Sequence, residues 1–214
     1  MKNLKTIFIA FLLGVFVFAC SDKPAVDNSL SSSSAMPTPK PAGSPVYDDE
    51  VAVFETDYGN FKIALYPDVA PRHVENFKKL IREKFYDGLG FHRVIPDRII
   101  QGGDPQTRGG GNRATWGAGD PSLSKVPAEF STRPFVRGAV GMARTSDPNS
   151  ASSQFFICVA PEHQWDGQYT VFGEVTQGLN NVQIISNVPL EPGSKDKVRE
   201  LPVIKRAYLE KRQQ

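Results

Sequence analysis

Short apolar or alternating segments, three to eight residues long, run through the chain from about residue 50 to residue 209 and are separated by glycine-containing or polar turns. Segments of this length and spacing predict β-strands. Many short strands joined by glycine-rich connections are typical of a closed antiparallel barrel. The expected strands lie at residues 51–55, 60–66, 91–94, 99–101, 139–143, 155–158, 171–175 and 202–209.

Two segments interrupt this pattern with helical spacing. Residues 71–85 carry apolar side chains every three or four positions, begin with Pro71, which suits the first turn of a helix, and are followed by Gly88. Residues 178–186 repeat the apolar spacing. Residues 48–214 are numerous enough for one domain with a full hydrophobic core. We therefore expect a mainly β domain that contains two helices.

The amino-terminal residues have the layout of a bacterial export signal. Lys2 and Lys5 precede an apolar run at residues 7–19, which is shorter than the roughly 20 residues of a membrane span. The run ends in Val-Phe-Ala-Cys, which resembles the lipobox of a lipoprotein precursor. This resemblance predicts that residues 1–19 are removed and that lipid on Cys20 anchors the protein outside the cytoplasm, on the periplasmic face of a membrane or the cell surface. An ordinary signal peptide, or an uncleaved anchor, would make Cys20 incidental.

Residues 20–47 are rich in serine, proline, alanine and lysine and hold almost no large apolar residues. Such a segment cannot bury enough surface to offset the entropy of ordering it, so the sequence predicts a disordered tether. The net charge of +2 argues against nucleic acid as a partner. With Cys20 lipidated, Cys158 is the one remaining thiol, and its apolar neighbours predict a buried strand cysteine.

Two longer motifs carry the candidate chemistry. Residues 91–104 (FHRVIPDRIIQGGD) gather a cation, an amide and apolar side chains before the chain breaks on glycines, and residues 142–158 (MARTSDPNSASSQFFIC) place two adjacent aromatics after a polar turn. Together the motifs closely resemble the cyclophilin family of peptidyl-prolyl cis/trans isomerases, and the resemblance covers roughly residues 50 to 209. It implies a closed eight-stranded antiparallel β-barrel, capped by a helix at each end, with the substrate groove on the outer surface.

Rotation of a prolyl amide has a barrier near 18 to 20 kcal/mol but breaks no bond, so it needs no nucleophile, metal or redox cofactor. A protein can hold the proline ring in an apolar slot and aim a fixed donor at the amide nitrogen, which regains its lone pair as the bond twists. The resemblance makes Arg93 that donor and gives Gln101 the substrate backbone. The residues that match the family's substrate groove are Ile99, Met142, Ala143, Gln154, Phe156, Trp165 and Tyr169.

Two places depart from the family pattern. Arg98 stands where an aromatic is usual, which should loosen the proline pocket, although the aliphatic stem of arginine could cover part of the same surface. Gln164 stands where some relatives carry the tryptophan that contacts cyclosporin, and Trp165 and Tyr169 replace a leucine and a histidine. We expect activity to survive and cyclosporin to bind weakly.

These observations predict a monomeric, membrane-tethered prolyl isomerase that acts on proline-containing segments of exported or unfolded proteins and assists their folding. The alternative is a non-catalytic module or chaperone that grips proline-rich partners with the same groove. A metal site is not expected, because His73, His92 and His163 lack ligand spacing with an acidic or cysteine partner. The glycines between residues 102 and 111 lack the lysine and hydroxyl of a phosphate-binding loop.

Overall fold

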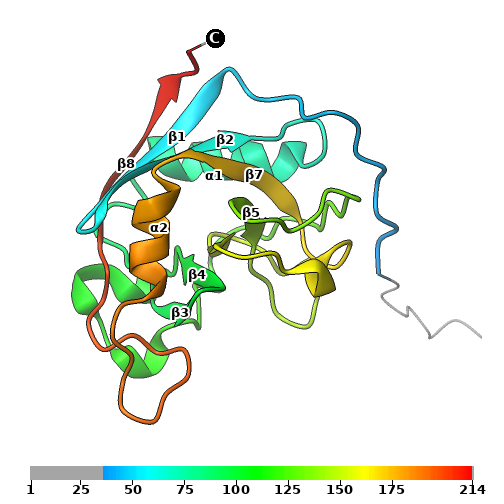
Figure 1. Ribbon diagram of the computed structural model, residues 1–214. Coiled ribbons are helices and arrows are strands. Elements are labelled where there is room, and N and C mark those ends of the chain that lie inside the picture. Colours follow the sequence, from blue (N-terminus) through cyan, green and yellow to red (C-terminus); the bar gives the residue numbers. More distant parts are fainter. Residues whose placement is uncertain (1–35, 214) are drawn as a thin grey trace, which may run out of the picture. The chain divides into compact units, whose positions relative to one another are not determined.

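The computed structural model describes residues 36–213, whose strands form one curled antiparallel sheet (Figure 1). All eight expected strands are present, and the prediction of an eight-stranded antiparallel β architecture is confirmed. Neighbours in the sheet follow the order β3-β4-β6-β5-β7-β2-β1-β8. The strands are β1 (Glu50–Thr56), β2 (Gly59–Leu65), β3 (Arg93–Ile95), β4 (Ile99–Gly102), β5 (Ala139–Met142), β6 (Phe155–Cys158), β7 (Val171–Gln177) and β8 (Ile204–Lys211).

Closure of the barrel is less complete than we expected, because the edge strands β3 and β8 are not paired with each other. The segment that precedes β3 is joined instead to the start of β8 and to the residues just before it. The N–H groups of Gly88 and Phe91 donate to the carbonyls of Ile204 and Pro202 at 2.8 and 2.9 Å, and Ile204 N–H donates to Leu89 at 2.7 Å. Pro202 has no N–H to continue a ladder. The result is a half-barrel whose open side is bridged by a short seam.

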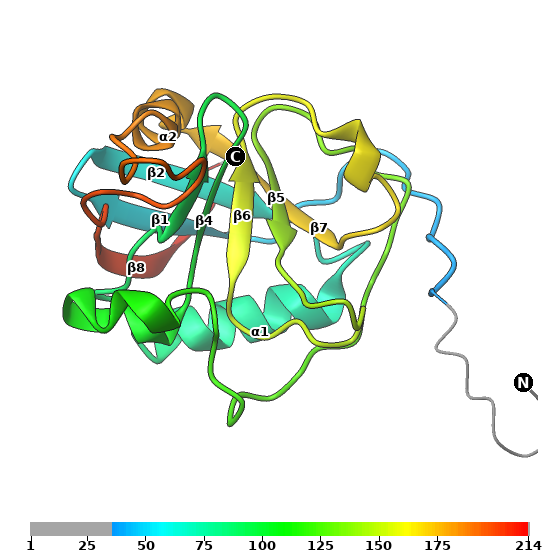
Figure 2. The ribbon, with the colours of Figure 1, turned by 90° about the horizontal axis from the view of Figure 1, so that it is seen from below.

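Helices α1 (Pro71–Arg82) and α2 (Leu179–Ser186) lie at opposite sides of the curled sheet (Figure 2). Helix α1 is three residues shorter than expected, and Lys84 just beyond its end has a φ of 55°, which is incompatible with continued helix. Its first turn is capped from a distant loop: the backbone N–H groups of Arg72 and His73 donate to the Glu129 carboxylate at 3.2 and 3.0 Å. Short 3₁₀ turns, η1 (Pro105–Gly110), η2 (Arg113–Thr115) and η3 (His163–Trp165), lie in the loops.

Aromatic rings fill the space between α1 and the sheet. Phe54 stacks on Phe61 with 5.2 Å between ring centroids, and Phe77 from α1 meets Phe172 edge-on at 4.9 Å. Phe155 from β6 joins the same cluster and is fully buried. Edge-to-face and offset contacts of this kind add to the stabilisation that burial itself supplies. The side chain that follows, Phe156, therefore points to the opposite face of the sheet.

Residues 36–47, which we expected to be part of the disordered tether, belong to the same compact unit as the domain. Lys40 N–H donates to the Phe130 carbonyl at 2.7 Å, and Thr132 N–H donates to the Lys40 carbonyl at 2.9 Å. The expected boundary at residue 48 is therefore too late. The predicted signal peptide, Cys20 and the first part of the tether lie outside the described residues. Within residues 36–213, none of the helices has the length and apolar character to cross a bilayer.

Candidate active site

Arg93 and Gln101 lie opposite each other on the paired strands β3 and β4. Arg93 Nη1 donates to Gln101 Oε1 at 3.3 Å, and Arg93 Nε donates to Asp196 Oδ2 at 2.8 Å. Gln101 Nε2 donates to Gln154 Oε1 at 3.0 Å, and Gln154 in turn donates to the Gly117 carbonyl at 3.1 Å. A continuous row of hydrogen bonds thus fixes the guanidinium and both amides along one face.

A small apolar pocket opens beside this row. Its floor is Phe156, which is 4% exposed and stacks on Phe135 at 5.4 Å between centroids. Trp165 and Tyr169 meet the Phe156 ring edge-on at 5.1 and 5.8 Å. The pocket has a volume of about 110 Å³, which is on the scale of a proline ring, and is lined by Arg93, Ile99, Gln101, Ala143, Arg144, Phe156, Trp165 and Tyr169.

The pocket brings together seven of the nine residues that the sequence singled out in the domain. Gln154 lines an adjoining hollow of about 360 Å³ that shares Gln101 and Ala143 with the pocket. Met142 is 2% exposed and belongs to the hydrophobic core. It does not line the pocket: it alternates with Gly141 and Ala143 along the chain, so its side chain points to the opposite side of the sheet.

Sequence reasoning missed two residues of the site. Asp196 forms the ion pair with Arg93 although 103 positions separate them, and no local pattern marks it. Arg144 lines the pocket and both adjoining hollows. Its position directly after Ala143 was a usable signal, because Ala143 was already assigned to the groove wall.

Arg98 does not line the pocket. Its guanidinium makes a two-pronged ion pair with Glu162, in which Nε lies 2.6 Å from Oε1. These hydrogen bonds lower the pKa of Glu162, against the effect of burial. Glu162 also accepts the backbone N–H of Trp165 at 2.9 Å through its carbonyl. The arginine in place of an aromatic therefore fastens the loop that carries a pocket wall, and its stem does not cover the pocket as we had considered.

His92 precedes Arg93 and is buried, and neither ring nitrogen finds a partner among the described residues. Burial lowers the pKa of His92 to about 4, and the nearby Arg93 acts in the same direction while Asp104 opposes it. The ring is therefore neutral at physiological pH. Of these two neighbouring residues, only Arg93 carries a positive charge beside the pocket.

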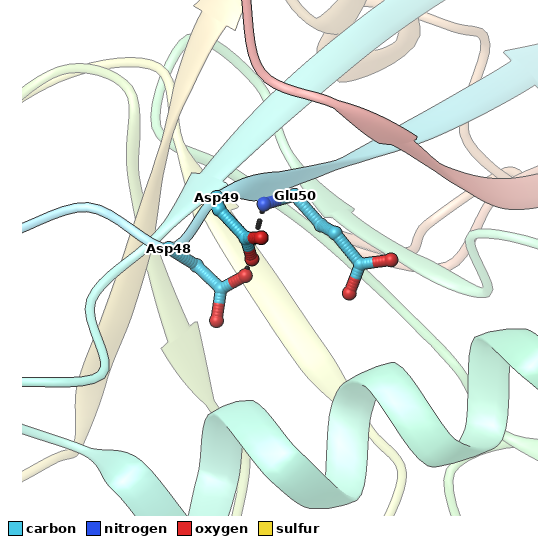
Figure 3. Close-up of side chains that lie close together, drawn as sticks. All are labelled: Asp48, Asp49 and Glu50. Carbon is cyan, nitrogen blue, oxygen red and sulfur yellow. Dashed lines mark hydrogen bonds between the residues drawn. The ribbon is translucent and has the colours of Figure 1, made fainter.

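The acidic residues Asp48, Asp49 and Glu50 cluster at the start of β1 (Figure 3). Lys78 reaches Asp48 at 2.7 Å and Glu50 at 2.9 Å, and Lys211 reaches Asp49 at 2.7 Å. The cluster is thus matched by cations from α1 and β8. Its carboxylate oxygens lie within 4.8 Å of one another, and the two lysines compensate their charge and tie the strand to its neighbours.

Comparison with known proteins shows similarity of this chain to one family. The model of the family described as cyclophilin-type peptidyl-prolyl cis-trans isomerase matches residues 51–209. A probable peptidyl-prolyl cis-trans isomerase of Brucella suis is 44% identical over 140 residues, which cover 64% of this chain and 71% of the relative. A peptidyl-prolyl cis-trans isomerase-like 1 protein of Rhizopus delemar is 39% identical, with coverage of 63% and 78%.

Solved structures that resemble this chain are also cyclophilin-type isomerases. A cyclophilin-type isomerase of Cryptosporidium parvum superposes with a TM-score of 0.65 at 26% identity, covering 78% of this chain and all of that one. The same protein in the presence of the dipeptide Ala-Pro gives a TM-score of 0.65 at 27% identity, with coverage of 76% and 99%. The chain belongs to the cyclophilin-type peptidyl-prolyl cis-trans isomerases. It is an isomerase of X-Pro bonds. The alternative hypothesis, a non-catalytic binding module, is not favoured.

Proposed function

We propose that Arg93 is the group that accelerates rotation in this isomerase and that the Phe156 pocket holds the proline ring. As the amide twists, its nitrogen loses conjugation and becomes a hydrogen-bond acceptor. A donor that meets this nitrogen only in the twisted state lowers the barrier without tightening the ground state. Guanidinium suits this task because it stays charged and its donors form a rigid fork.

The hydrogen bonds of Arg93 carry this proposal. Nε is held by Asp196 and Nη1 by Gln101, while Nη2 has no hydrogen-bond partner among the described residues. Both N–H groups of Nη2 are thus available on a guanidinium whose orientation is already fixed. A preorganised donor of this kind contributes about 10²- to 10³-fold in rate. Gln101 shares the pocket lining with Arg93 and supplies an amide for the substrate backbone.

The test is an NMR exchange measurement of cis/trans rotation in a short proline peptide, with and without catalytic amounts of protein. Arg93→Ala should reduce the acceleration about 10²- to 10³-fold. Peptide affinity, followed by chemical-shift titration, should fall much less, because the Phe156 pocket remains. Undiminished exchange in the variant would remove Arg93 from the mechanism, and no exchange with the unaltered protein would remove the reaction itself.

We also propose that the enzyme acts outside the cytoplasm on exported polypeptides, anchored by lipid on Cys20. The basic and apolar residues before Cys20 and the lipobox-like ending support this location. Cys158 is not expected to carry lipid in place of Cys20, because it is buried and burial raises the pKa of its thiol. Growth with an alkyne-tagged fatty acid should label the protein, and Cys20→Ser should abolish the label and release the protein from membranes. Labelling that survives this substitution would contradict the anchor.

Two further expectations concern partners. The domain is proposed to act as a monomer, and its cyclosporin affinity is proposed to be weak because Gln164 replaces an aromatic contact. Gln164 donates to the Glu162 carboxylate, so its amide is engaged at the loop. Sedimentation and a cyclosporin titration test these two points.

A further inference from the structure

A hollow of about 500 Å³ adjoins the proline pocket on the side of Arg93. It shares Arg93, Gln101 and Arg144 with the pocket. Four of its lining side chains are cationic and two are carboxylates, while His92 is neutral. Positive charge is therefore in excess beside the place where the prolyl bond lies.

The two carboxylates are already engaged. Asp196 accepts from Arg93 Nε at 2.8 Å, and Glu191 accepts from Arg113 Nη1 at 2.6 Å. The remaining cations, Arg144 and Lys197, make no ion pair with any acid among residues 36–213. The acids of the hollow thus cancel two of its charges and leave two.

Arg144 is the better placed of these cations, because it also lines the proline pocket and the hollow on the other side. Its Nε and Nη2 donate to the Gln168 carbonyl at 3.3 and 2.9 Å, and Nη1 donates to the Thr145 carbonyl at 2.9 Å. The guanidinium also lies 4.5 Å from the centroid of the Tyr169 ring. These neutral contacts fix its position and leave its charge uncompensated.

We propose that Arg144 makes this isomerase selective for prolines with an acidic side chain close by in the sequence, with Lys197 adding to the same field. The inference rests on the proposed function, since the groove must hold the prolyl bond for a neighbouring residue to reach Arg144. A carboxylate there meets a preoriented charged donor. A lysine at the same position meets unpaired positive charge. A hydrogen bond from Arg144 to a charged carboxylate is stronger than one to a neutral amide. We therefore expect kcat/KM to be about five- to tenfold higher for the glutamate peptide than for the glutamine peptide.

The test measures exchange by NMR on one host peptide that contains a single proline. Glutamate, glutamine or lysine is placed in turn at each of the two positions on either side of it. The full chain should favour glutamate over glutamine and glutamine over lysine at one position at least. The preference should shrink in 1 M salt, since the Debye length falls to about 3 Å there.

Arg144→Gln should bring the ratio of glutamate to glutamine close to one. Arg137→Gln is the matched control, because Arg137 is an exposed arginine just before β5, at the end of that strand away from Arg144. It should leave the ratio unchanged. Equal rates for glutamate and glutamine peptides at every position would overturn the inference, and so would a preference that persists in Arg144→Gln. The glutamine peptide reports the isomerase reaction separately, so a failure of catalysis is not mistaken for a failure of selectivity.

Discussion

A methyl group at position 141 would collide with Phe156, the floor of the pocket that we propose for the proline ring. Gly141 in β5 is the direct cross-strand partner of Phe156 in β6. A Cβ atom built on Gly141 would lie 2.4 Å from Cζ of Phe156 and 2.6 Å from Cε1 of Phe135. Carbon atoms in ordinary contact are about 3.5 to 4.0 Å apart, so both rings must move by about 1 Å.

The cost of Gly141→Ala to stability follows from this overlap. Overpacking a well-filled site costs about 1 to 3 kcal/mol. Alanine also restricts the unfolded chain more than glycine does, which offsets about 0.4 to 1 kcal/mol. The net change in the free energy of unfolding should be a loss of about 1 to 2 kcal/mol.

The effect on catalysis should be larger than the effect on stability. Trp165 and Tyr169 already contact the Phe156 ring at centroid distances of 5.1 and 5.8 Å, so a displaced ring reduces a pocket of only about 110 Å³. A misplacement of about 1 Å can cost up to 10²-fold in rate. We expect kcat/KM for a proline peptide to fall about 10- to 100-fold.

The variant should be compared with the parent protein by urea denaturation and by NMR exchange. Gly43→Ala is the control, since a Cβ on Gly43 would have no heavy atom within 4 Å and should change neither measurement. A two-dimensional NMR spectrum establishes that the variant is folded. A folded Gly141→Ala protein with undiminished exchange would show that Phe156 is not the floor of the working pocket.

Substitutions at three other positions test the contacts that hold the site and helix α1 in place. Asp196→Ala should lower kcat about tenfold by freeing the Arg93 side chain, and Asp196→Asn, which keeps an acceptor, should retain more activity in the same exchange assay. Arg98→Ala leaves the 2%-exposed Glu162 carboxylate without its cation and should cost about 1 to 3 kcal/mol in urea denaturation. Burial acts to raise the pKa of Glu129. Hydrogen bonds from His73 and Arg72, in the first turn of α1, nevertheless hold that pKa at about 2 rather than 4.5. The stability that Glu129 supplies is therefore complete above about pH 4.5 and lost as the pH falls toward 2, so the deficit of Glu129→Gln should shrink over this window.

Local patterns in the sequence were sufficient for the strands and helices. Alternating and apolar runs marked each strand, because neighbouring residues of a strand point to opposite faces of the sheet. Burial of one face therefore gives an alternating pattern, and burial of both faces gives a continuous apolar run. Arg93, Gln101 and Phe156 lie in two motifs whose order resembles one family. The ends of the elements were less well predicted: β3 and β8 begin two residues later than expected, and α1 ends three residues earlier. The left-handed backbone at Lys84, which ends the helix, is a conformation that its side chain does not reveal.

Contacts between distant residues could not be predicted in this way. The acids that meet Arg93 and Arg98 follow them by 103 and 64 positions, and Glu129 caps a helix that begins more than 50 positions earlier. An isolated aspartate or glutamate in a loop is also compatible with a solvated surface. Three-dimensional placement alone identifies its partner.

The start of the folded unit was missed for another reason. The composition of residues 36–47 argues against a hydrophobic core, but Lys40 joins the domain through its backbone, which pairs with Phe130 and Thr132. Backbone hydrogen bonds depend little on side-chain type. A proline-rich segment can therefore be held by a domain that it could not form by itself.

The two ion pairs of the site share an architecture that explains how the pocket stays in shape. Both arginines belong to the β3–β4 hairpin, and both acids lie in later loops: Asp196 in the connection from α2 to β8, and Glu162 at the turn that carries Trp165. The hairpin is itself hydrogen-bonded to β6, which supplies Phe156. The donor, the floor and a wall of the pocket are thus attached to one rigid element. In the proposed mechanism preorganised groups act on the twisted amide without moving, so the loop that carries Trp165 must stay in place, and the ion pair of Arg98 with Glu162 fastens it.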